Sequence, residues 1–527
     1  MKKRKIATAM LIALLVIGQS LAACTIIAVT KGASADGSTM TSHTCDSTGD
    51  DLRLWLIPSM EEGTTRDLVV SGRKDTDFTN FPEVVYGQSA TVVGQLENTK
   101  DTNQYLHAMY SFGNDKGLTM GESTCGYSRN TEQGQKLRTY YNVANGVVDA
   151  YMLQDLALEN CSTAKEAVIY MGEILDEYKW DGSCEIFNIG DGEECWIMEI
   201  YGSNLWVAVR VPDGQVFVGA NRARIDYLVE DDPENWLYTE NIKGIALENG
   251  LWDGVSEFRP NQLFSPLTSW GCSLREWRVM TLLDSDLELD PYGDPDDWPL
   301  FVTPDEKVSV NDVWEICADY YDGTPFSAAE SIYAGPYGDV LDPKYVNRPI
   351  GVPQQTYVQI SNVKSWLPEE ARCLVWFGFG TAITQYITPV FASANYLPEH
   401  MYTGTRAEGY NEDSGWWVQA SVQTKTQLNF MNAIKDVRAV RDPLIAEQYD
   451  TTFAIQNAAA KMIAEGDKEG AVELLTSYSA NQAKMWHELY KDLAVDLESK
   501  YWNERVGMRT GGVTEWWQKN VIDAGIK

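Results

Sequence analysis

Residues 24–46 read CTIIAVTKGASADGSTMTSHTCD, and this stretch determines the fold that the sequence predicts. Residues 24–30 form an apolar, β-branched run, which is typical of a buried strand. A loop of small residues follows and contains the turn dipeptide Asp36-Gly37. Residues 38–44 then read as a second strand. The two strands are expected to pair as an antiparallel hairpin.

Closure of this hairpin is expected to return the second strand to Cys24. On this pairing His43, Cys45 and Asp46 all lie close to Cys24. We expect Cys45 to form a disulfide with another cysteine rather than to take part in catalysis. The hairpin therefore gathers a thiol, an imidazole and a carboxylate at the start of its first strand.

The residues before Cys24 have the layout of a secretory signal peptide. Residues 2–5 are basic, residues 6–18 are apolar, and two alanines directly precede Cys24. The apolar run is too short to span a bilayer comfortably. We therefore expect residues 1–23 to be removed, the protein to be exported, and Cys24 to become the first residue of the mature chain. No later stretch suggests a transmembrane span.

A cysteine at a mature N-terminus carries both a nucleophile and a base. Its thiolate attacks carbonyl groups, and its α-amine, with an ordinary pKa of about 7.7–8.0, accepts protons near neutral pH. Two other interpretations of Cys24 stay open. The sequence LAAC, residues 21–24, also fits a bacterial lipoprotein, in which a lipid on Cys24 would prevent catalysis. Cys24 is alternatively one half of an ordinary disulfide.

The composition argues against several classes of partner. The chain has 527 residues, of which 44% are hydrophobic, so it is expected to fold around a substantial core. Loss of the four basic residues in the first 23 takes the net charge from −34 to −38. So acidic a protein is not expected to bind nucleic acid or anionic membranes. The nine cysteines include no C-x-x-C pair and the four histidines are scattered, so neither a metal nor a cofactor is expected.

Further strands are predicted in the middle of the chain. They read as a three-stranded meander over residues 194–200, 205–211 and 215–220. The segments between them are rich in turn-forming residues. The last strand of this meander places Asn221 at its end.

Helical patterns surround these strands. The predicted helices run over residues 163–178, 308–320 and most of 428–501. Ser309 and Asn311 are candidate caps of the second of them. Strand clusters alternating with helix clusters predict an α+β architecture. We expect one domain over 24–425, with residues 426–527 as a helical C-terminal elaboration packed on it.

A series of short motifs runs in order from Cys24 to about residue 450. It opens with CTII, SADGSTM and DS in residues 24–47, and its later blocks are GNDKGL (113–118), GEST (121–124), WVAVRVPD (206–213), GANR (219–222), VSVNDV (308–313), DGTPF (322–326), RPI (348–350), WLPE (366–369) and SGWW (414–417). Each block alone is weak evidence of a family resemblance, but the ordered series is specific evidence of one. It resembles the dipeptidase family of N-terminal-nucleophile cysteine hydrolases, the dipeptidase A type to which secernin is related. The resemblance implies a four-layer αββα sandwich.

The resemblance also implies roles for individual residues. Cys24 matches the nucleophile, Asp46 an acid near the amine of the nucleophile, and Asn221 a donor to the tetrahedral oxyanion. Arg275 resembles a distal arginine of the related acylases, although an arginine on a helix surface is an alternative for it. His43 stands where the family often has arginine.

Glu122 and Ser123 are candidates for binding the ammonium group and the backbone of a substrate. We therefore interpret the chain as an exported cysteine dipeptidase that acts on small peptides. Two alternatives are a related amidase or acylase acting on N-acyl substrates, and a non-enzymatic surface lipoprotein lipidated at Cys24. A homo-oligomer is left open by the sequence.

Overall fold

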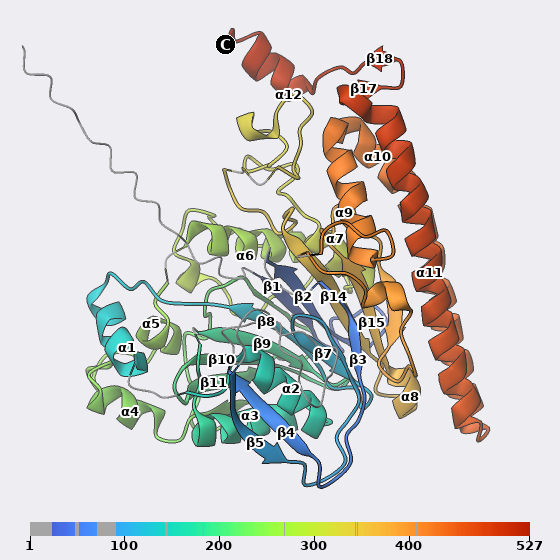
Figure 1. Cartoon of the computed structure of the whole chain (residues 1–527). Coiled ribbons are helices and arrows are strands. Elements are labelled where there is room, and N and C mark those ends of the chain that lie inside the picture. Colours follow the sequence, from blue (N-terminus) through green and yellow to red (C-terminus); the bar gives the residue numbers. More distant parts are fainter. Residues whose placement is uncertain are drawn as a thin grey trace, which may run out of the picture.

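The computed structural model describes most of the chain (Figure 1). It covers residues 24–47, 52–70, 91–142, 146–182, 184–267, 269–342, 344, 346–406 and 408–526. The predicted signal peptide, residues 1–23, lies outside these described residues. Two large antiparallel sheets form the centre, and most of the helices lie on their outer sides.

The first sheet has six strands, each antiparallel to its neighbours. In spatial order they are β12 (Val216–Gly219), β1 (Thr25–Val29), β2 (Thr39–Asp46), β14 (Gln355–Val363), β15 (Cys373–Phe379) and β16 (Thr388–Phe391). The predicted hairpin is confirmed, since Thr25 pairs with Thr44 and Ile26 pairs with His43. Cys24 therefore stands directly before a strand that has a partner on each edge.

The predicted meander is only partly correct. Its first two strands pair as expected, but β12 leaves them and pairs with β1 in the first sheet. The side chains of β12 are buried on both faces, with Phe217 in one core cluster and Val216 and Val218 in another. A strand with apolar side chains on both faces must be covered on both faces. The local sequence does not indicate which of the two sheets such a strand joins.

The second sheet has eight strands and is also antiparallel. In spatial order they are β13 (Trp236–Tyr238), β11 (Leu205–Arg210), β10 (Cys195–Gly202), β9 (Glu185–Gly190), β8 (Thr119–Thr124), β7 (Ser111–Asn114), β6 (Tyr105–His107) and β3 (Trp55–Ile57). A separate hairpin, β4 (Thr65–Val70) and β5 (Thr91–Glu97), lies beside α2. Strands β8 and β9 form the middle of the sheet.

The two sheets face each other across β2, β8 and β9. Buried polar side chains join them, because Asn188 Nδ2 donates to the carbonyl oxygens of Ile27 and Ser42 at 2.8 and 3.1 Å. Gly121 permits this close approach. A Cβ atom at that position would lie 2.5 Å from Asn188 Oδ1 and 2.6 Å from the Ser42 carbonyl oxygen. The spacing of the sheets is therefore fixed one residue before Glu122.

Helices α2 (Ala150–Asn160) and α3 (Ala164–Tyr178) cover the outer side of the second sheet. The helix predicted over 163–178 is confirmed, and Thr163 caps it by accepting from the Glu166 amide. Three further helices lie to the left of β10 and β11 in Figure 1: α1 (Glu132–Asn142), α4 (Ile242–Glu248) and α5 (Pro260–Phe264).

A larger set of helices covers the outer side of the first sheet. They are α6 (Trp270–Leu283), α7 (Val310–Cys317), α8 (Glu369–Arg372), α9 (Gly415–Thr426), α10 (Phe430–Ala464) and α11 (Lys468–Tyr501). Ser309 caps α7 through a capping box with Asp312, so the cap is Ser309 and not Asn311. The long pair α10 and α11 confirms the helical prediction for 428–501. A small hairpin and helix end the chain: β17 (Arg505–Val506), β18 (Arg509–Thr510) and α12 (Glu515–Trp517).

The mixed α and β class and the helical C-terminal region are thus confirmed. Helices α10 and α11 share one core cluster with the first sheet, in which Trp486 stacks on Tyr386. The division at residues 425 and 426 stays a prediction. Among the described helices, none combines the length and the apolar character needed to cross a membrane.

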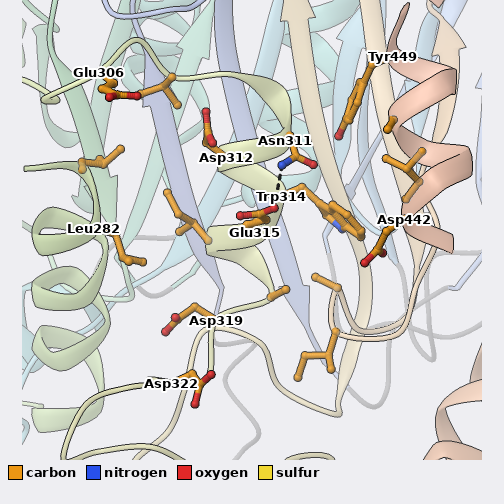
Figure 2. Close-up of a pocket in the computed structure, with 18 of the residues that line it drawn as sticks. Leu282, Glu306, Asn311, Asp312, Trp314, Glu315, Asp319, Asp322, Asp442 and Tyr449 are labelled. Atoms are coloured by element: carbon orange, nitrogen blue, oxygen red, sulfur yellow. Dashed lines mark hydrogen bonds between the residues drawn. The ribbon is translucent and has the colours of Figure 1, made fainter. Parts of the chain in front are cut away.

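A large open groove lies outside the first sheet, between α6, α7 and α10 (Figure 2). Its volume is about 1010 Å³, and its walls carry several carboxylates, among them Asp312, Glu315, Asp319 and Asp442. None of the seven candidate site residues named from the sequence lines it. The groove is therefore separate from the candidate site residues.

Candidate active site

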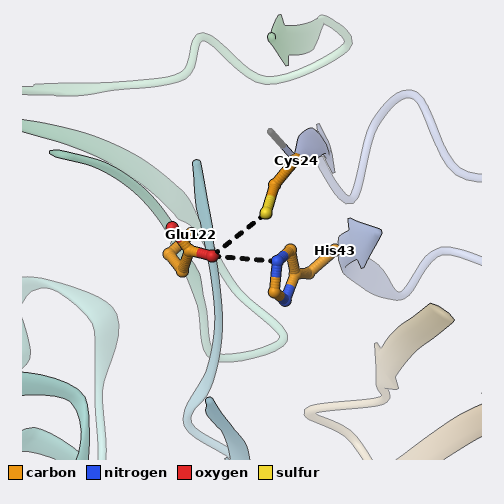
Figure 3. Close-up of side chains that lie close together, drawn as sticks. All are labelled: Cys24, His43 and Glu122. Atoms are coloured by element: carbon orange, nitrogen blue, oxygen red, sulfur yellow. Dashed lines mark hydrogen bonds and ion pairs between the residues drawn. The ribbon is translucent and has the colours of Figure 1, made fainter. Parts of the chain in front are cut away.

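Cys24 lies at the facing sides of the two sheets and is fully buried. Its Sγ–H donates to Oε1 of Glu122, 3.3 Å away on β8 (Figure 3). The same oxygen lies 3.0 Å from Nε2 of His43 on β2. Three strands from two sheets thus bring the thiol, the imidazole and the carboxylate together, as the hairpin predicted for Cys24 and His43.

The charge of Glu122 depends on its neighbours. Burial opposes ionisation, but the charge and the hydrogen bond of His43 outweigh it and lower the pKa of Glu122. The opposite holds for Glu185, whose pKa is raised well above its usual range by burial and by the charge of Glu122. The two shifts have opposite directions, so Glu122 is the member of the pair that ionises more readily.

Aromatic side chains enclose His43. Its Nδ1 lies 3.3 Å from the Tyr357 hydroxyl, and the rings of Tyr110 and Tyr357 meet it edge-on, with centroids 5.3 and 5.5 Å away. Tyr110 also accepts a hydrogen bond from Tyr151 at 2.9 Å. The imidazole is therefore held in one orientation and shielded from water.

Arg275 holds the main chain of Cys24. Its Nη1 donates to the Cys24 carbonyl oxygen at 2.9 Å, and its Nη2 donates to Oδ1 of Asn221 at 2.7 Å. Ser123 Oγ donates to the same Cys24 carbonyl at 3.1 Å. Arg275 belongs to α6 but is buried, so it is not an arginine on a helix surface. The structure thus brings all three residues to the candidate nucleophile.

Asn221 follows β12 in the left-handed backbone region, with φ of 63°. Asparagine tolerates this conformation better than most residues. Its main-chain N–H donates to Ser123 Oγ at 3.0 Å, and its Nδ2 donates to the Thr124 carbonyl at 2.6 Å. Glu199 braces the next residues, because its Oε1 accepts from the amides of Arg224 and Ile225. The side-chain amide of Asn221 is therefore held at the same end of β8 as Glu122.

Asp46 ends β2 and is buried. Its Oδ2 accepts from Nη2 of Arg348 at 2.6 Å, while its buried Oδ1 has no hydrogen-bond partner among the described residues. Burial raises the pKa of Asp46 to about 6, against the lowering effect of Arg348 and Arg275. Burial also raises the pKa of the Cys24 thiol, and Glu122 adds to this effect. A positive charge placed beside both groups would stabilise both anions.

A disulfide fixes the ends of the two central strands. It joins Cys125 and Cys184, which directly follow β8 and precede β9. The expected disulfide at Cys45 is wrong, because Cys45 is a buried thiol on β2 and outside any disulfide. Its predicted position close to Cys24 suggested a bridge, but the β2 register gives it Tyr357 as its strand partner instead. Cys24 is likewise not in a disulfide.

Two residues of the site were not singled out from the sequence. Glu185 begins a strand, EIFNIG, whose residues are all buried, so the single charged residue of this run was the available signal. Arg348 appeared only within the motif RPI. Its pairing with Asp46 joins residues 302 positions apart, and no local pattern encodes that contact.

The described residues offer one group of side chains able to hold a metal ion, namely Cys24, His43 and Glu122. Their ligand atoms all lie within 4.8 Å of one another. The same three atoms can also perform acid, base and nucleophilic chemistry without a metal.

Comparisons with known proteins identify the family of the chain. Residues 23–442 match Peptidase family C69. The chain is 24% identical to a probable dipeptidase of Latilactobacillus sakei over 500 residues, which cover 90% of this chain and 95% of that protein. It is 23% identical to probable dipeptidase A of Streptococcus pyogenes serotype M18 (82% and 88% covered) and 25% identical to a dipeptidase of Bifidobacterium longum (74% and 75%). A match over most of the chain, beginning one residue before Cys24, shows that the chain belongs to Peptidase family C69.

Proposed function

We propose that this protein is an exported cysteine dipeptidase in which removal of residues 1–23 leaves Cys24 as nucleophile and its α-amine as base. The observation that carries the proposal is the placement of the Cys24 thiol, 3.3 Å from a buried carboxylate and at the head of a strand paired on both edges. The relatives named as dipeptidases support the choice of substrate. On this proposal the two facing sheets with helices on both outer sides form an αββα sandwich of the N-terminal-nucleophile type.

The new α-amine has a place to bind. The amine replaces the peptide nitrogen of Cys24, and Asp46 offers the buried Oδ1 that has no other described partner. An ammonium group there would favour the carboxylate of Asp46 and the thiolate of Cys24, both of which burial disfavours. Processing would thereby create the base and also make the thiol easier to ionise.

The reaction then follows in two steps. The Cys24 thiol attacks the scissile carbonyl carbon, a C–S bond forms, and the thiol proton moves to the α-amine. Asn221 and backbone amides stabilise the oxyanion. The C–N bond breaks as the α-ammonium returns the proton to the leaving amine. Water, deprotonated by the α-amine, then attacks the thioester carbon, and the C–S bond breaks. This step releases the N-terminal amino acid, and the α-ammonium returns the proton to Sγ.

Glu122 explains a preference for a free amino terminus. In a dipeptide the ammonium nitrogen lies about 2.5 Å from the scissile carbonyl carbon, because a single Cα atom joins them. A carbonyl carbon in reach of Sγ therefore brings the ammonium to the carboxylate that lies 3.3 Å from Sγ. An N-acyl substrate would place a neutral amide against that buried charge, which is unfavourable. The buried charge of Glu122 therefore favours the dipeptidase over the acylase.

The test uses protein purified from its native host. Intact mass and N-terminal sequencing are expected to show a free Cys24, and the protein is expected to cleave dipeptides faster than their N-acetylated forms. Cys24→Ser is expected to lose this activity. Cys373→Ser, which alters another buried thiol on β15, is the matched control and is expected to retain it.

Three outcomes would contradict the proposal. A mass raised by acyl chains on Cys24 would identify a surface lipoprotein instead. Faster cleavage of N-acylated amides would identify an acylase. Full activity in a correctly folded Cys24→Ser variant would remove Cys24 from the mechanism.

A further inference from the structure

Cys24, His43 and Glu122 form a ligand set that suits a different occupant from a peptide. Each contributes one donor atom, a thiol sulfur, an imidazole nitrogen and a carboxylate oxygen. All three side chains are buried, and they come from two facing sheets rather than from one flexible loop. Ligands held in this way lose little conformational freedom when they bind an ion.

The distances between these atoms fit a tetrahedral ion. Zinc–ligand distances of about 2.0–2.3 Å require ligand atoms about 3.4–3.6 Å apart at tetrahedral angles. The structure has 3.3 Å between Sγ and Glu122 Oε1, and 3.0 Å between His43 Nε2 and the same oxygen. Both edges therefore lie within about 0.4 Å of the required value, and the third is no longer than 4.8 Å.

The donor types select the metal. Sulfur and imidazole nitrogen favour Zn²⁺ over Mg²⁺ and Ca²⁺, which prefer oxygen ligands. We infer that Cys24, His43 and Glu122 bind Zn²⁺ reversibly, and that the bound ion inhibits the enzyme by occupying its nucleophile. Binding converts the Sγ–H of Cys24 into a zinc thiolate, and the displaced proton passes to solvent. No electron transfer is involved.

The mature N-terminus would strengthen this site. A free α-amine on Cys24 lies on the same residue as Sγ, so sulfur and nitrogen can chelate one ion and complete four-fold coordination. This fourth ligand rests on the proposed function, whereas the three side-chain ligands do not. A closed site of four protein ligands leaves no position for a reacting water, which is the arrangement of structural rather than catalytic zinc.

The experiment measures binding and activity separately on the mature, chelator-treated protein. Co²⁺ is the spectroscopic probe, and it is expected to give a thiolate-to-cobalt charge-transfer band that saturates at one ion per chain. Zn²⁺ is expected to abolish this band by displacement, and to inhibit dipeptide hydrolysis with a slow onset because the ligands are enclosed. Inhibition should reverse on addition of a chelator.

Variants identify the ligands. Cys24→Ser is expected to lose the cobalt band, and His43→Asn to weaken Zn²⁺ binding at least about 100-fold, because losing a ligand costs more than losing a group that only supports one. Cys373→Ser is expected to keep the affinity and the basal activity. An unchanged Zn²⁺ affinity in His43→Asn, or the absence of a cobalt band in the wild type, would overturn the inference.

The two proposals fail in different ways. Dipeptide hydrolysis in chelator without any cobalt band would refute the zinc site and leave the dipeptidase intact. A cobalt band that depends on Cys24 in a protein that cleaves no dipeptide would refute the dipeptidase and leave the metal site intact.

Discussion

Replacing Arg275 by lysine tests whether this buried guanidinium positions Cys24, the proposed nucleophile. Its five N–H groups make five hydrogen bonds, to the Cys24 carbonyl, Thr25 Oγ1, the Ala220 carbonyl, Asn221 Oδ1 and the Gly271 carbonyl. A lysine ammonium has three donors at a single point, so at least two of these five hydrogen bonds are lost.

The expected magnitude follows from those two lost hydrogen bonds. Each hydrogen bond to a charged group contributes about 1.5–3 kcal/mol, so Arg275→Lys should lower the free energy of unfolding by about 3–6 kcal/mol. If about 1.4–2.8 kcal/mol of this loss also raises the activation free energy of the reaction, kcat/KM falls about 10- to 100-fold. The fall should be mainly in kcat, because Arg275 orients Cys24 and Asn221 rather than the substrate.

The assay combines urea unfolding with steady-state cleavage of a dipeptide. Arg278→Lys is the matched control, since Arg278 is on the same helix but pairs with Asp319 at 2.7–2.9 Å near the surface. It is expected to change both quantities little. If Arg275→Lys behaves like Arg278→Lys in both assays, Arg275 does not position the site.

Three further changes test the framework of the site. Gly121→Ala introduces a Cβ atom 2.5 Å from a side-chain oxygen of the adjacent strand, so it should lower both stability and kcat/KM, whereas Gly126→Ala, with open space around its Cβ, should lower neither through a clash. Glu199 has a pKa raised to about 7 by burial, against about 4.3 when unfolded. The folded state therefore holds its proton more tightly, and about 3–4 kcal/mol of stability present below about pH 4.3 is lost as the pH rises through 7. Glu199→Gln should flatten this loss in melting temperatures measured from pH 4 to 8. Cys125→Ser with Cys184→Ser opens a loop with a sequence separation of 59 residues and should cost about 4 kcal/mol in denaturant unfolding, with reduced activity.

Each of these expectations has a result that contradicts it. Equal stability of Gly121→Ala and Gly126→Ala would mean that the sheets separate without cost. An unchanged pH slope in Glu199→Gln would mean that Glu199 is ionised in the folded protein. Wild-type stability and activity in the double serine variant would show that the ends of β8 and β9 do not depend on their disulfide.

The parts of the fold that depend on neighbouring residues were predictable from the sequence. The hairpin at Cys24 has a turn dipeptide between two β-branched runs, and the C-terminal helices have a long regular period. The hairpin also fixed His43 beside Cys24, because the register of a hairpin follows from its turn. These are local properties, and the structure confirms them.

Contacts between segments far apart in the sequence were harder to predict from the sequence. The partner of β12 depends on which sheet edge is open, and the raised pKa of Glu185 depends on its burial and on the charge of Glu122. The Arg348–Asp46 pair likewise arises only when β2 and the segment before β14 come together. Such contacts are set by the packing of whole sheets, which a single sequence shows only where a resemblance carries the information.

The position of β1 also constrains the order of events in the biogenesis of the protein. A strand bonded on both edges cannot be drawn out to lie extended in the cleft of a processing peptidase, which recognises its substrate through the same backbone groups. On the proposed function, the cut before Cys24 must therefore be made while the segment is still unfolded, during export. On the same proposal, a chain that folded first would bury its own cleavage point and remain an inactive precursor.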